Sequence, residues 1–381
     1  MLSMLAAALD GSGPAILPLD PDLPEPALAR ILESFAPAVL HTTTGTRSLH
    51  LPAASEAAAA GIRADTAVVI ATSGSTGEPK AVELSTAALT ASAAASLRRL
   101  GAGPGERWLC CLPTFHIAGI GVLVRSLIAG LEPVIVPAIS ADILARSGSA
   151  HVSLVPTQLR RLLDAGASPG SVRTVLLGGA ASGDALLAEA RTAGWRVVTT
   201  YGMSETCGGC VYDGLPLDDV SVRLGSDGGQ IEIAGPVLFS GYLARPDLTA
   251  AAVQAGWFHT ADLGWWRPDG TLGIRGRADD VINTGGVKVL PGEVEAALGT
   301  CDGVADVVVI GVPDAEWGEA VTAFVIAADP GDPPVLECLR RHVRQAVSVY
   351  AAPKRIVVVP EFPLLPSGKP DRLALRRLGE A

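Results

Sequence analysis

Short apolar runs alternate with helix-like segments through most of the chain. The runs cover residues 108–112, 133–136, 152–155, 175–177 and 197–198. Apolar runs of this length between helical segments are typical of α/β proteins whose strands are largely buried. We therefore expect an α/β fold over this part of the chain.

The pattern changes after Gly228, where short segments are separated by many Gly and Pro turns. Residues 230–233 and 270–275 predict antiparallel strands of a β-rich subdomain. A separate α+β unit follows residues 276–280 and opens with a helix near Pro291. Its strands are expected at residues 304–312 and 320–326, and its second helix at residues 335–347.

Composition indicates a globular protein of two or three domains. The 381 residues are 49% hydrophobic and carry a formal net charge of −10, which argues against nucleic acid or an anionic membrane as a main partner. The most apolar stretch, residues 108–124, is broken by polar side chains and is shorter than a membrane helix. We therefore expect no membrane insertion. Since no basic region precedes the apolar start, we also expect no export.

The six cysteines are scattered along the chain. They form no disulfide framework, so the simplest interpretation is a set of reduced thiols in the cytoplasm. Cys207 and Cys210 form a C-x-x-C pair, which can be half of a zinc site or a redox pair. Because no second such pair accompanies them, a structural role is favoured.

A run of glycines and hydroxyls from Thr72 to Lys80 is suited to binding phosphate. Its glycines allow positive φ and inward-facing N–H groups, and its hydroxyls share one concave turn. These residues are Gly74 and Gly77, with Thr72, Ser73, Ser75 and Thr76. An apolar run precedes the loop and an alanine-rich segment follows it, which predicts a strand, loop and helix in that order. Glu78 and Pro79 exclude a Walker A pattern, and an ordinary Ser/Gly turn is the alternative.

Four further motifs place polar side chains in predicted loops. The first offers an aromatic ring, hydroxyls and a carboxylate, which suit base stacking, phosphate contact and Mg²⁺ binding. The second is an Asp in a predicted tight loop, and the last is a Gly-flanked lysine that by itself would be interpreted as a solvated tail residue. In chain order the motifs are residues 201–206, Asp262, Arg277 before the Asp279–Asp280 pair, and Lys369.

With the phosphate loop, these motifs resemble the adenylate-forming superfamily of acyl-CoA ligases, peptide-synthetase adenylation domains and luciferases. The resemblance covers about residues 68–372. It implies an α/β fold with a shortened N-terminal part. A large domain, residues 1–278, would bind ATP and the acyl substrate and include the β-rich subdomain, while a small mobile α+β domain, residues 279–381, would carry the catalytic lysine. ATP and coenzyme A (CoA) are implied as co-substrates and Mg²⁺ as cofactor.

The resemblance also implies a role for each matching residue. The phosphates are bound by Thr72, Ser73, Gly74, Ser75, Thr76, Gly77 and Lys80, and the nucleotide is bordered by Gly178, Gly179, Ala180, Tyr201, Gly202 and Met203. The ribose is contacted by Asp262 and Arg277, the α-phosphate is approached by Ser204, and Mg²⁺ is bound by Glu205. The catalytic lysine is Lys369, the hinge is Asp279, and the residues of the CoA step are Gly285 and Gly286.

The chemistry of adenylation suits these residue types. The substrate carboxylate attacks the α-phosphorus and pyrophosphate leaves, so the site must neutralise two anions. Mg²⁺ on Glu205, the amides of the loop and Lys369 can each stabilise the transition-state charge. The resemblance implies that the C-terminal domain then rotates about Asp279 and withdraws Lys369 before the thiol reacts.

His116 opens an apolar segment that predicts a buried helix, with Arg125 nine positions later. A buried arginine is costly unless an anion meets it. That anion is either a protein carboxylate or a second carboxylate of the substrate, distinct from the one that becomes adenylated. The spacing resembles o-succinylbenzoyl-CoA ligases of menaquinone biosynthesis, in which the matching His lines the acyl pocket and the matching Arg lies near the benzoate carboxylate.

This narrower resemblance implies activation of o-succinylbenzoate and its transfer to CoA. Two alternatives stay open. One is adenylation of another aryl or alicyclic acid, with transfer to CoA or a carrier protein. The other is a catalytically silent homologue that binds nucleotide or acyl ligand, which the retention of Glu205, Asp262, Arg277 and Lys369 disfavours. The expected partners are small molecules, and a homodimer is left open.

Overall fold

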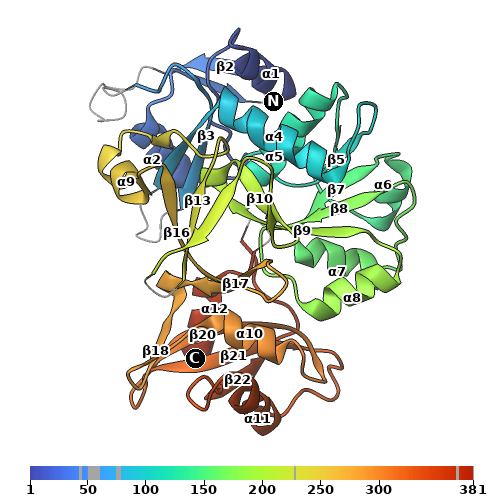
Figure 1. Cartoon of the computed structure of the whole chain (residues 1–381), viewed down its shortest axis with the longest axis vertical. Coiled ribbons are helices and arrows are strands. Elements are labelled where there is room, and N and C mark those ends of the chain that lie inside the picture. Colours follow the sequence, from blue (N-terminus) through green and yellow to red (C-terminus); the bar gives the residue numbers. More distant parts are fainter. Residues whose placement is uncertain (43–44, 50–60, 74–78, 227–228, 366–368, 381) are drawn as a thin grey trace.

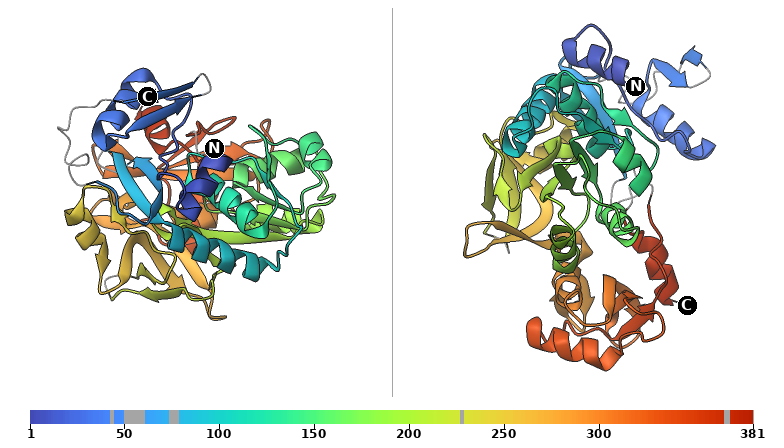
Figure 2. Two further views of the ribbon diagram at one scale, coloured as in Figure 1. Left: turned by 90° about the horizontal axis from the view of Figure 1, so that it is seen from above. Right: turned by 90° about the vertical axis from the view of Figure 1, so that its right-hand side faces the viewer.

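Figure 1 shows the computed structural model of the chain, which describes residues 1–42, 45–49, 61–73, 79–226, 229–365 and 369–380. A large N-terminal part lies above a smaller C-terminal part, and Figure 2 shows the same two parts from the side. The expected α/β class, with a large and a small part, is confirmed. The boundary between residues 278 and 279 stays a prediction.

A seven-stranded sheet with helices on both faces forms the centre of the N-terminal part. Its order is β11 (Leu215–Pro216), β10 (Gly208–Tyr212), β9 (Val197–Met203), β8 (Thr174–Leu177), β7 (His151–Leu154), β5 (Trp108–Cys110) and β6 (Val134–Ile135). The strands from β9 to β6 are parallel, and β10 and β11 extend the sheet in antiparallel fashion. The predicted buried strands are therefore confirmed.

Successive side chains along the buried strands point to opposite faces of this sheet, and helices cover both faces. The helices are α4 (Thr86–Leu100), α5 (Ile117–Ala129), α6 (Ala141–Arg146), α7 (Pro156–Asp164) and α8 (Asp184–Thr192). Trp108 and Cys110 pack in the core with α4 and α5, whereas Leu109 and Cys111 pack in the core with α6, α7 and α8. None of the described helices is long and apolar enough to cross a membrane.

Smaller sheets complete the N-terminal part and confirm the β-rich subdomain. One sheet contains β14 (Gly241–Tyr242), β4 (Pro79–Ser85) and β3 (Thr66–Ser73), and another contains β12 (Ser221–Leu224), β13 (Gln230–Ala234), β16 (Trp257–Trp266) and β15 (Val253–Gln254), with β17 (Leu272–Arg277) paired to β16. The remaining elements are α1 (Leu2–Asp10), α2 (Glu25–Phe35), β1 (Val39–Thr42), β2 (Gly45–Ser48), α9 (Pro246–Ala252), η1 (Ser204–Thr206) and η2 (Ala278–Asp280).

The predicted strand, loop and helix around the phosphate loop is wrong in one respect. The loop joins two antiparallel strands, β3 and β4, and α4 begins only after β4. Polar Glu83 concealed β4 in the sequence. It is buried because its carboxylate accepts hydrogen bonds from the Arg63 amide, at 3.1 Å, and the Thr66 hydroxyl, at 3.2 Å.

The C-terminal part has its own five-stranded sheet and two small cores. The sheet contains β19 (Val287–Val289), β18 (Ile282–Thr284), β21 (Gly318–Ala327), β20 (Val304–Asp314) and β22 (Arg355–Val358), and its helices are α10 (Pro291–Leu298), α11 (Leu336–Ala346) and α12 (Arg372–Glu380). Val307 and Val309 of β20 pack in one core with α10 and α11, while Val308 and Ile310 pack with α12. The predicted strands and helices of this part are confirmed.

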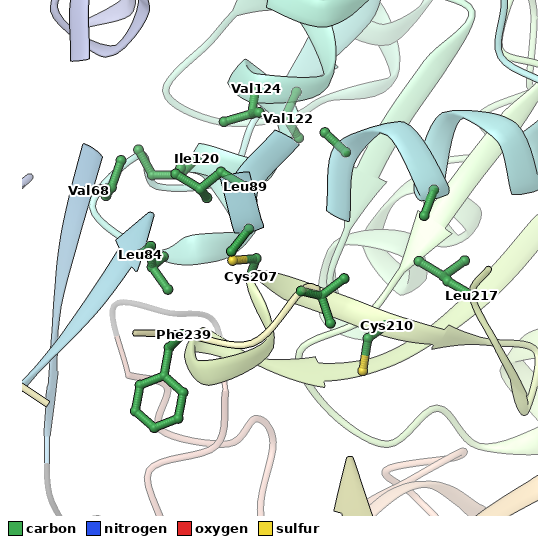
Figure 3. Packing of buried hydrophobic residues seen from close by; sticks show 14 of the residues in the cluster. Val68, Leu84, Leu89, Ile120, Val122, Val124, Cys207, Cys210, Leu217 and Phe239 are labelled. Atoms are coloured by element: carbon green, nitrogen blue, oxygen red, sulfur yellow. The ribbon is translucent and has the colours of Figure 1, made fainter. Parts of the chain in front are cut away.

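The core beside α4 and α5 contains the C-x-x-C pair. Figure 3 shows Cys207 and Cys210 near aliphatic side chains that include Ile120 and Leu217. Both thiols are free and buried, and burial raises the pKa of Cys210 to about 12. Within the described ranges, no group of three His, Cys, Asp or Glu side chains could hold a metal ion. These observations support a packing role for the pair.

Candidate active site

The described ends of the phosphate loop lie beside Glu205. The Thr72 hydroxyl donates to the Lys80 carbonyl at 3.3 Å and so helps to close the base of the loop. The Lys80 ammonium lies 5.6 Å from the centre of the Tyr242 ring, and the Tyr242 hydroxyl donates to Glu205 Oε1 at 2.9 Å. Tyr242 thus links the loop lysine to the carboxylate predicted to bind Mg²⁺. Residues Gly74, Ser75, Thr76 and Gly77 lie outside the described residues, as does the side chain of Ser73.

Glu205 is held at the start of a short 3₁₀ turn, η1, immediately after β9. Its carbonyl accepts the Phe239 amide at 2.8 Å, which fixes the backbone. Burial and the adjacent Glu205 carboxylate both raise the pKa of Tyr242, so the phenol stays protonated and donates its hydrogen bond. Ser204 is the first residue of this turn, directly beside Glu205.

Asp262 and Arg277 face each other across adjacent strands. They are register partners of β16 and β17, and Asp262 Oδ1 lies 3.6 Å from Arg277 Nη1. The Tyr201 hydroxyl donates to Asp262 Oδ2 at 2.8 Å, and the Thr260 hydroxyl accepts the Asp262 amide at 3.0 Å. Burial raises the pKa of Asp262, while the Tyr201 hydrogen bond and Arg277 oppose that rise.

The prediction of a tight loop at Asp262 is wrong, because this residue lies within the ten-residue strand β16. The register of β16 with β17 shifts between Leu263 and Gly264, so an irregularity follows Asp262 directly. A buried aspartate in a strand is unusual, and its three polar neighbours, Thr260, Tyr201 and Arg277, make the position tolerable.

Arg277 also forms a two-pronged ion pair with the predicted hinge residue. Its Nε and Nη2 donate to the two carboxylate oxygens of Asp279 at 2.8 and 2.7 Å. This pair lowers the pKa of Asp279 and raises that of Arg277. The last residue of β17 is therefore tied to η2, where the chain passes into the C-terminal part.

Glycines bring backbone segments close together around this site. A Cβ on Gly178 would lie 2.3 Å from the Thr200 hydroxyl, and one on Gly202 would lie 2.0 Å from the Gly208 carbonyl oxygen. Gly179 has a φ of 85°, in the left-handed region. Ala180 follows it on the exposed side of the same turn, and Met203 ends β9 after Gly202. The nucleotide-bordering role of these residues stays a prediction.

Lys369 reaches from the C-terminal part to the N-terminal part. Its Cε lies 4.0 Å from the position that a Cβ on Gly179 would occupy. Surrounding protein atoms and the positive charge of Arg277 lower the pKa of Lys369, and Asp262 partly offsets them. The structure thus brings together Lys369, Asp262, Arg277 and Gly179. The Gly285–Gly286 turn lies elsewhere, and the Gly285 amide donates to the Trp317 carbonyl at 2.8 Å.

His116 lies at the N-cap position of α5, and the charge of Lys369 affects its pKa. Burial and the Lys369 ammonium lower the pKa of His116, so the imidazole is neutral near pH 7. Its Nε2 is buried and has no hydrogen-bond partner in the described part of the chain. A buried polar atom of this kind is costly unless a ligand satisfies it.

Arg125 is a buried cation on α5, only 8% exposed. Its Nη2 donates to the Ser153 hydroxyl at 3.1 Å, and its guanidinium carbon lies 4.5 Å from the centre of the Trp108 ring. Its Nε has no partner among the described residues. Nη1 lies 3.3 Å from the position of a Cβ on Gly121, so the side chain extends back toward the N-terminal end of α5.

A structural ion pair does not account for Arg125. Within residues 1–42, 45–49, 61–73, 79–226, 229–365 and 369–380, no ion pair joins this guanidinium to an Asp or Glu at 4.0 Å or less, and the nearby groups that raise its pKa are the phenol of Tyr212 and the thiol of Cys110. Burial outweighs them and lowers the pKa of Arg125. A desolvated guanidinium with a single hydroxyl partner is suited to binding an anionic ligand.

Several contributing residues were missed in the sequence. Tyr242 orients the Glu205 carboxylate, Thr260 holds the Asp262 backbone, and Trp108 and Ser153 contact Arg125. The chain has only four tyrosines, and this scarcity could have pointed to Tyr242. No sequence signal distinguishes Thr260, Trp108 or Ser153 from ordinary core residues.

Replacing Asp262 with asparagine is expected to raise the KM for ATP about 10- to 100-fold, the effect of losing one or two hydrogen bonds to a charged group. The KM for the acid should change much less, because Asp262 is predicted to contact the ribose. Steady-state kinetics with each substrate varied in turn would measure both values. Asp269→Asn, in the exposed turn after β16, is the control, and an equal rise in both KM values would contradict the predicted role.

Comparisons with known proteins identify the family of the chain. Residues 1–243 match the family described as AMP-binding enzyme, and residues 293–369 match the AMP-binding enzyme C-terminal domain. A probable 2-succinylbenzoate–CoA ligase of Mycobacterium tuberculosis is 44% identical over 372 residues, which cover 93% of this chain and 95% of that protein. A 2-succinylbenzoate–CoA ligase of Listeria monocytogenes is 33% identical, with 81% and 69% covered.

A solved structure shows the same fold. The o-succinylbenzoate CoA synthetase of Bacillus subtilis, in complex with its acyl-adenylate intermediate, is 28% identical and superposes with a TM-score of 0.74 over 99% of this chain and 81% of that one. The resemblance to the adenylate-forming superfamily is thereby confirmed, and the chain belongs to the family of AMP-binding enzymes.

Proposed function

We propose that the protein activates 2-succinylbenzoate, also called o-succinylbenzoate, with ATP and transfers the acyl group to CoA. The products would be 2-succinylbenzoyl-CoA, AMP and pyrophosphate. The relatives named 2-succinylbenzoate–CoA ligase support this substrate. The observation that carries the proposal is the buried Arg125, because this substrate has a second carboxylate that could meet the unpaired guanidinium.

In the first step, one carboxylate of the acid attacks the α-phosphorus and pyrophosphate leaves. Lys369, which lies beside Asp262 and Gly179, would contact both the attacking carboxylate and the α-phosphate. A cation at that point stabilises charge that develops on oxygen in the transition state. Asp262 and Arg277 would orient the nucleotide through its ribose, and Tyr201 and Thr260 hold Asp262 in place.

In the second step, the CoA thiol attacks the acyl-adenylate and AMP leaves. Lys369 comes from the C-terminal part, so rotation of that part about Asp279 would remove it from the reacting carbonyl. The same rotation would bring the Gly285–Gly286 turn toward the thiol. Its two glycines have φ values of 60° and 79°, a turn that other residues adopt only with strain.

Mg²⁺ fits Glu205 in this scheme. Mg²⁺ is commonly bound by one or two carboxylates together with substrate phosphates and water, and Glu205 is such a carboxylate near the base of the phosphate loop. The bound ion would neutralise phosphate charge. Tyr242 orients the carboxylate, and the Lys80 ammonium, 5.6 Å from the centre of the Tyr242 ring, would add a second positive charge near the phosphates.

Replacing Glu205 with glutamine is expected to raise the Mg²⁺ concentration for half-maximal activity about tenfold or more, because a charged ligand becomes neutral. Titrating Mg²⁺ in a pyrophosphate-exchange assay would measure it. Tyr242→Phe retains the carboxylate and removes only its orienting hydrogen bond, so it should have a smaller effect. An unchanged Mg²⁺ requirement in Glu205→Gln would rule out Glu205 as the ligand.

A pyrophosphate-exchange assay with several acids tests the proposed function. Exchange with 2-succinylbenzoate supports it. Exchange only with other aryl or alicyclic acids would favour the alternative substrate class, and no exchange with any acid would favour a silent homologue.

All six cysteines are free, which supports a reducing compartment such as the cytoplasm. Formation of a homodimer stays a prediction.

A further inference from the structure

The segment that carries Lys369 is pinned on both sides by the backbone. The Lys369 carbonyl accepts the Leu365 amide at 2.8 Å, and Leu364 and Pro370 form an antiparallel bridge. The Asp371 amide donates to the Pro363 carbonyl at 2.8 Å. The described residues on either side of 366–368 therefore lie antiparallel to each other, and residues 369–371 lead directly into α12. Any group that fixes the start of α12 also fixes the base of this segment.

Arg372, the first residue of α12, makes such a connection. Its Nη1 donates to the Val309 carbonyl at 2.9 Å and its Nη2 donates to Glu295 Oε1 at 3.0 Å. Its Nε lies 3.8 Å from an Asp280 carboxylate oxygen. One guanidinium thus connects α12 with α10, β20 and the turn that contains the predicted hinge. A lysine could not reach all three, because its ammonium is a single point of charge.

Glu295 is the buried end of this connection. The same oxygen that accepts Arg372 also accepts the Val309 amide at 2.8 Å. Burial raises the pKa of Glu295, and Arg372 and the Val309 amide oppose that rise. A buried carboxylate paired in this way needs its partner in place, so Arg372 and Glu295 define each other's positions.

We propose that Arg372 is a positioning residue for Lys369, holding the base of the lysine segment in register with the rest of the C-terminal part. This inference rests on the proposed two-step reaction. Lys369 acts only if its ammonium reaches the reacting oxygens, and misplacement by about 1 Å can cost about 100-fold in rate. The thioester step does not use Lys369, so loss of Arg372 should affect the two steps unequally.

The test compares Arg372→Lys with Arg376→Lys in the full-length protein. Arg376 lies one turn further along α12 and pairs with Glu319 at 3.3 Å, so its variant is a matched control. We expect Arg372→Lys to slow pyrophosphate exchange about 10- to 100-fold, and thioester formation from supplied acyl-adenylate to stay within about twofold. Arg376→Lys should leave both within about twofold. Equal loss of both steps in Arg372→Lys would mean that Arg372 is merely structural, and no loss would also overturn the proposal.

A second measurement does not depend on the substrate. Peptide mass spectrometry after brief labelling with acetic anhydride at several pH values reports the apparent pKa of Lys369. In Arg372→Lys and in Glu295→Gln this pKa should move up toward the ordinary lysine value, because Lys369 leaves its buried position and the neighbourhood of Arg277. An unchanged Lys369 titration in both variants would contradict the positioning role even if the proposed substrate proved wrong.

Discussion

Replacement of Lys369 with alanine is expected to slow adenylate formation by about 10²- to 10³-fold, the cost of removing one preorganised charge from a transition state. Thioester formation from supplied acyl-adenylate should stay within about twofold. The reason is the location of Lys369 beside Asp262 and Gly179. From this location it would stabilise charge at the α-phosphate, and the proposed second step requires that it leave before the thiol attacks.

Two assays separate these half-reactions. Pyrophosphate exchange reports adenylation, and AMP release from synthetic acyl-adenylate in the presence of CoA reports the second step. Arg377→Ala removes an exposed cation of α12 and should leave both rates unchanged. If Lys369→Ala slowed both half-reactions equally, the division of labour between them would be refuted.

Replacement of Arg125 with methionine should reduce kcat/KM for 2-succinylbenzoate by about 30- to 5,000-fold, since removing one member of a buried charged pair costs about 2–5 kcal/mol. The KM for ATP should change little. Methionine keeps much of the side-chain volume, which limits cavity formation beside Trp108. Without ligand the variant should be at least as stable as the original protein, because a buried, unpaired charge has been removed.

An analogue of the acid provides the control for Arg125. 4-Oxo-4-phenylbutanoate lacks the aromatic carboxylate but keeps the one that would be adenylated. The original protein should strongly prefer 2-succinylbenzoate over this analogue, and Arg125→Met should lose most of that preference. Equal losses with both acids, or a large drop in Tm, would mean that Arg125 has a structural role.

The sequence allowed much of the fold to be predicted because local periodicity matches burial. The apolar run after His116 became α5, and the continuous valine-rich run at residues 304–312 became β20. Prediction failed where a polar residue is buried by distant partners. Glu83 concealed β4, and Asp262 suggested a loop, because neither position shows in the sequence which groups will satisfy its charge.

The site could be predicted only as separate motifs. Glu205, Asp262, Arg277 and Lys369 were identifiable because their chemistry and order match a family. Their orienting partners were not, since Tyr242 meets the Glu205 carboxylate only through tertiary packing, and nothing in the sequence marks the Thr260 hydroxyl as the acceptor of the Asp262 amide. The absence of an ion pair at Arg125 in the described part of the chain likewise depends on tertiary packing, and it turned an ambiguous residue into a substrate hypothesis.

The central claim is that one protein makes an acyl-adenylate of 2-succinylbenzoate and passes the acyl group to CoA. Incubation with ATP, Mg²⁺, 2-succinylbenzoate and CoA, followed by mass spectrometry, tests it most directly. The account predicts 2-succinylbenzoyl-CoA and AMP in equal amounts, with no thioester when ATP is omitted. Adenylate that accumulates without thioester, or thioester formed only with other acids, would contradict it.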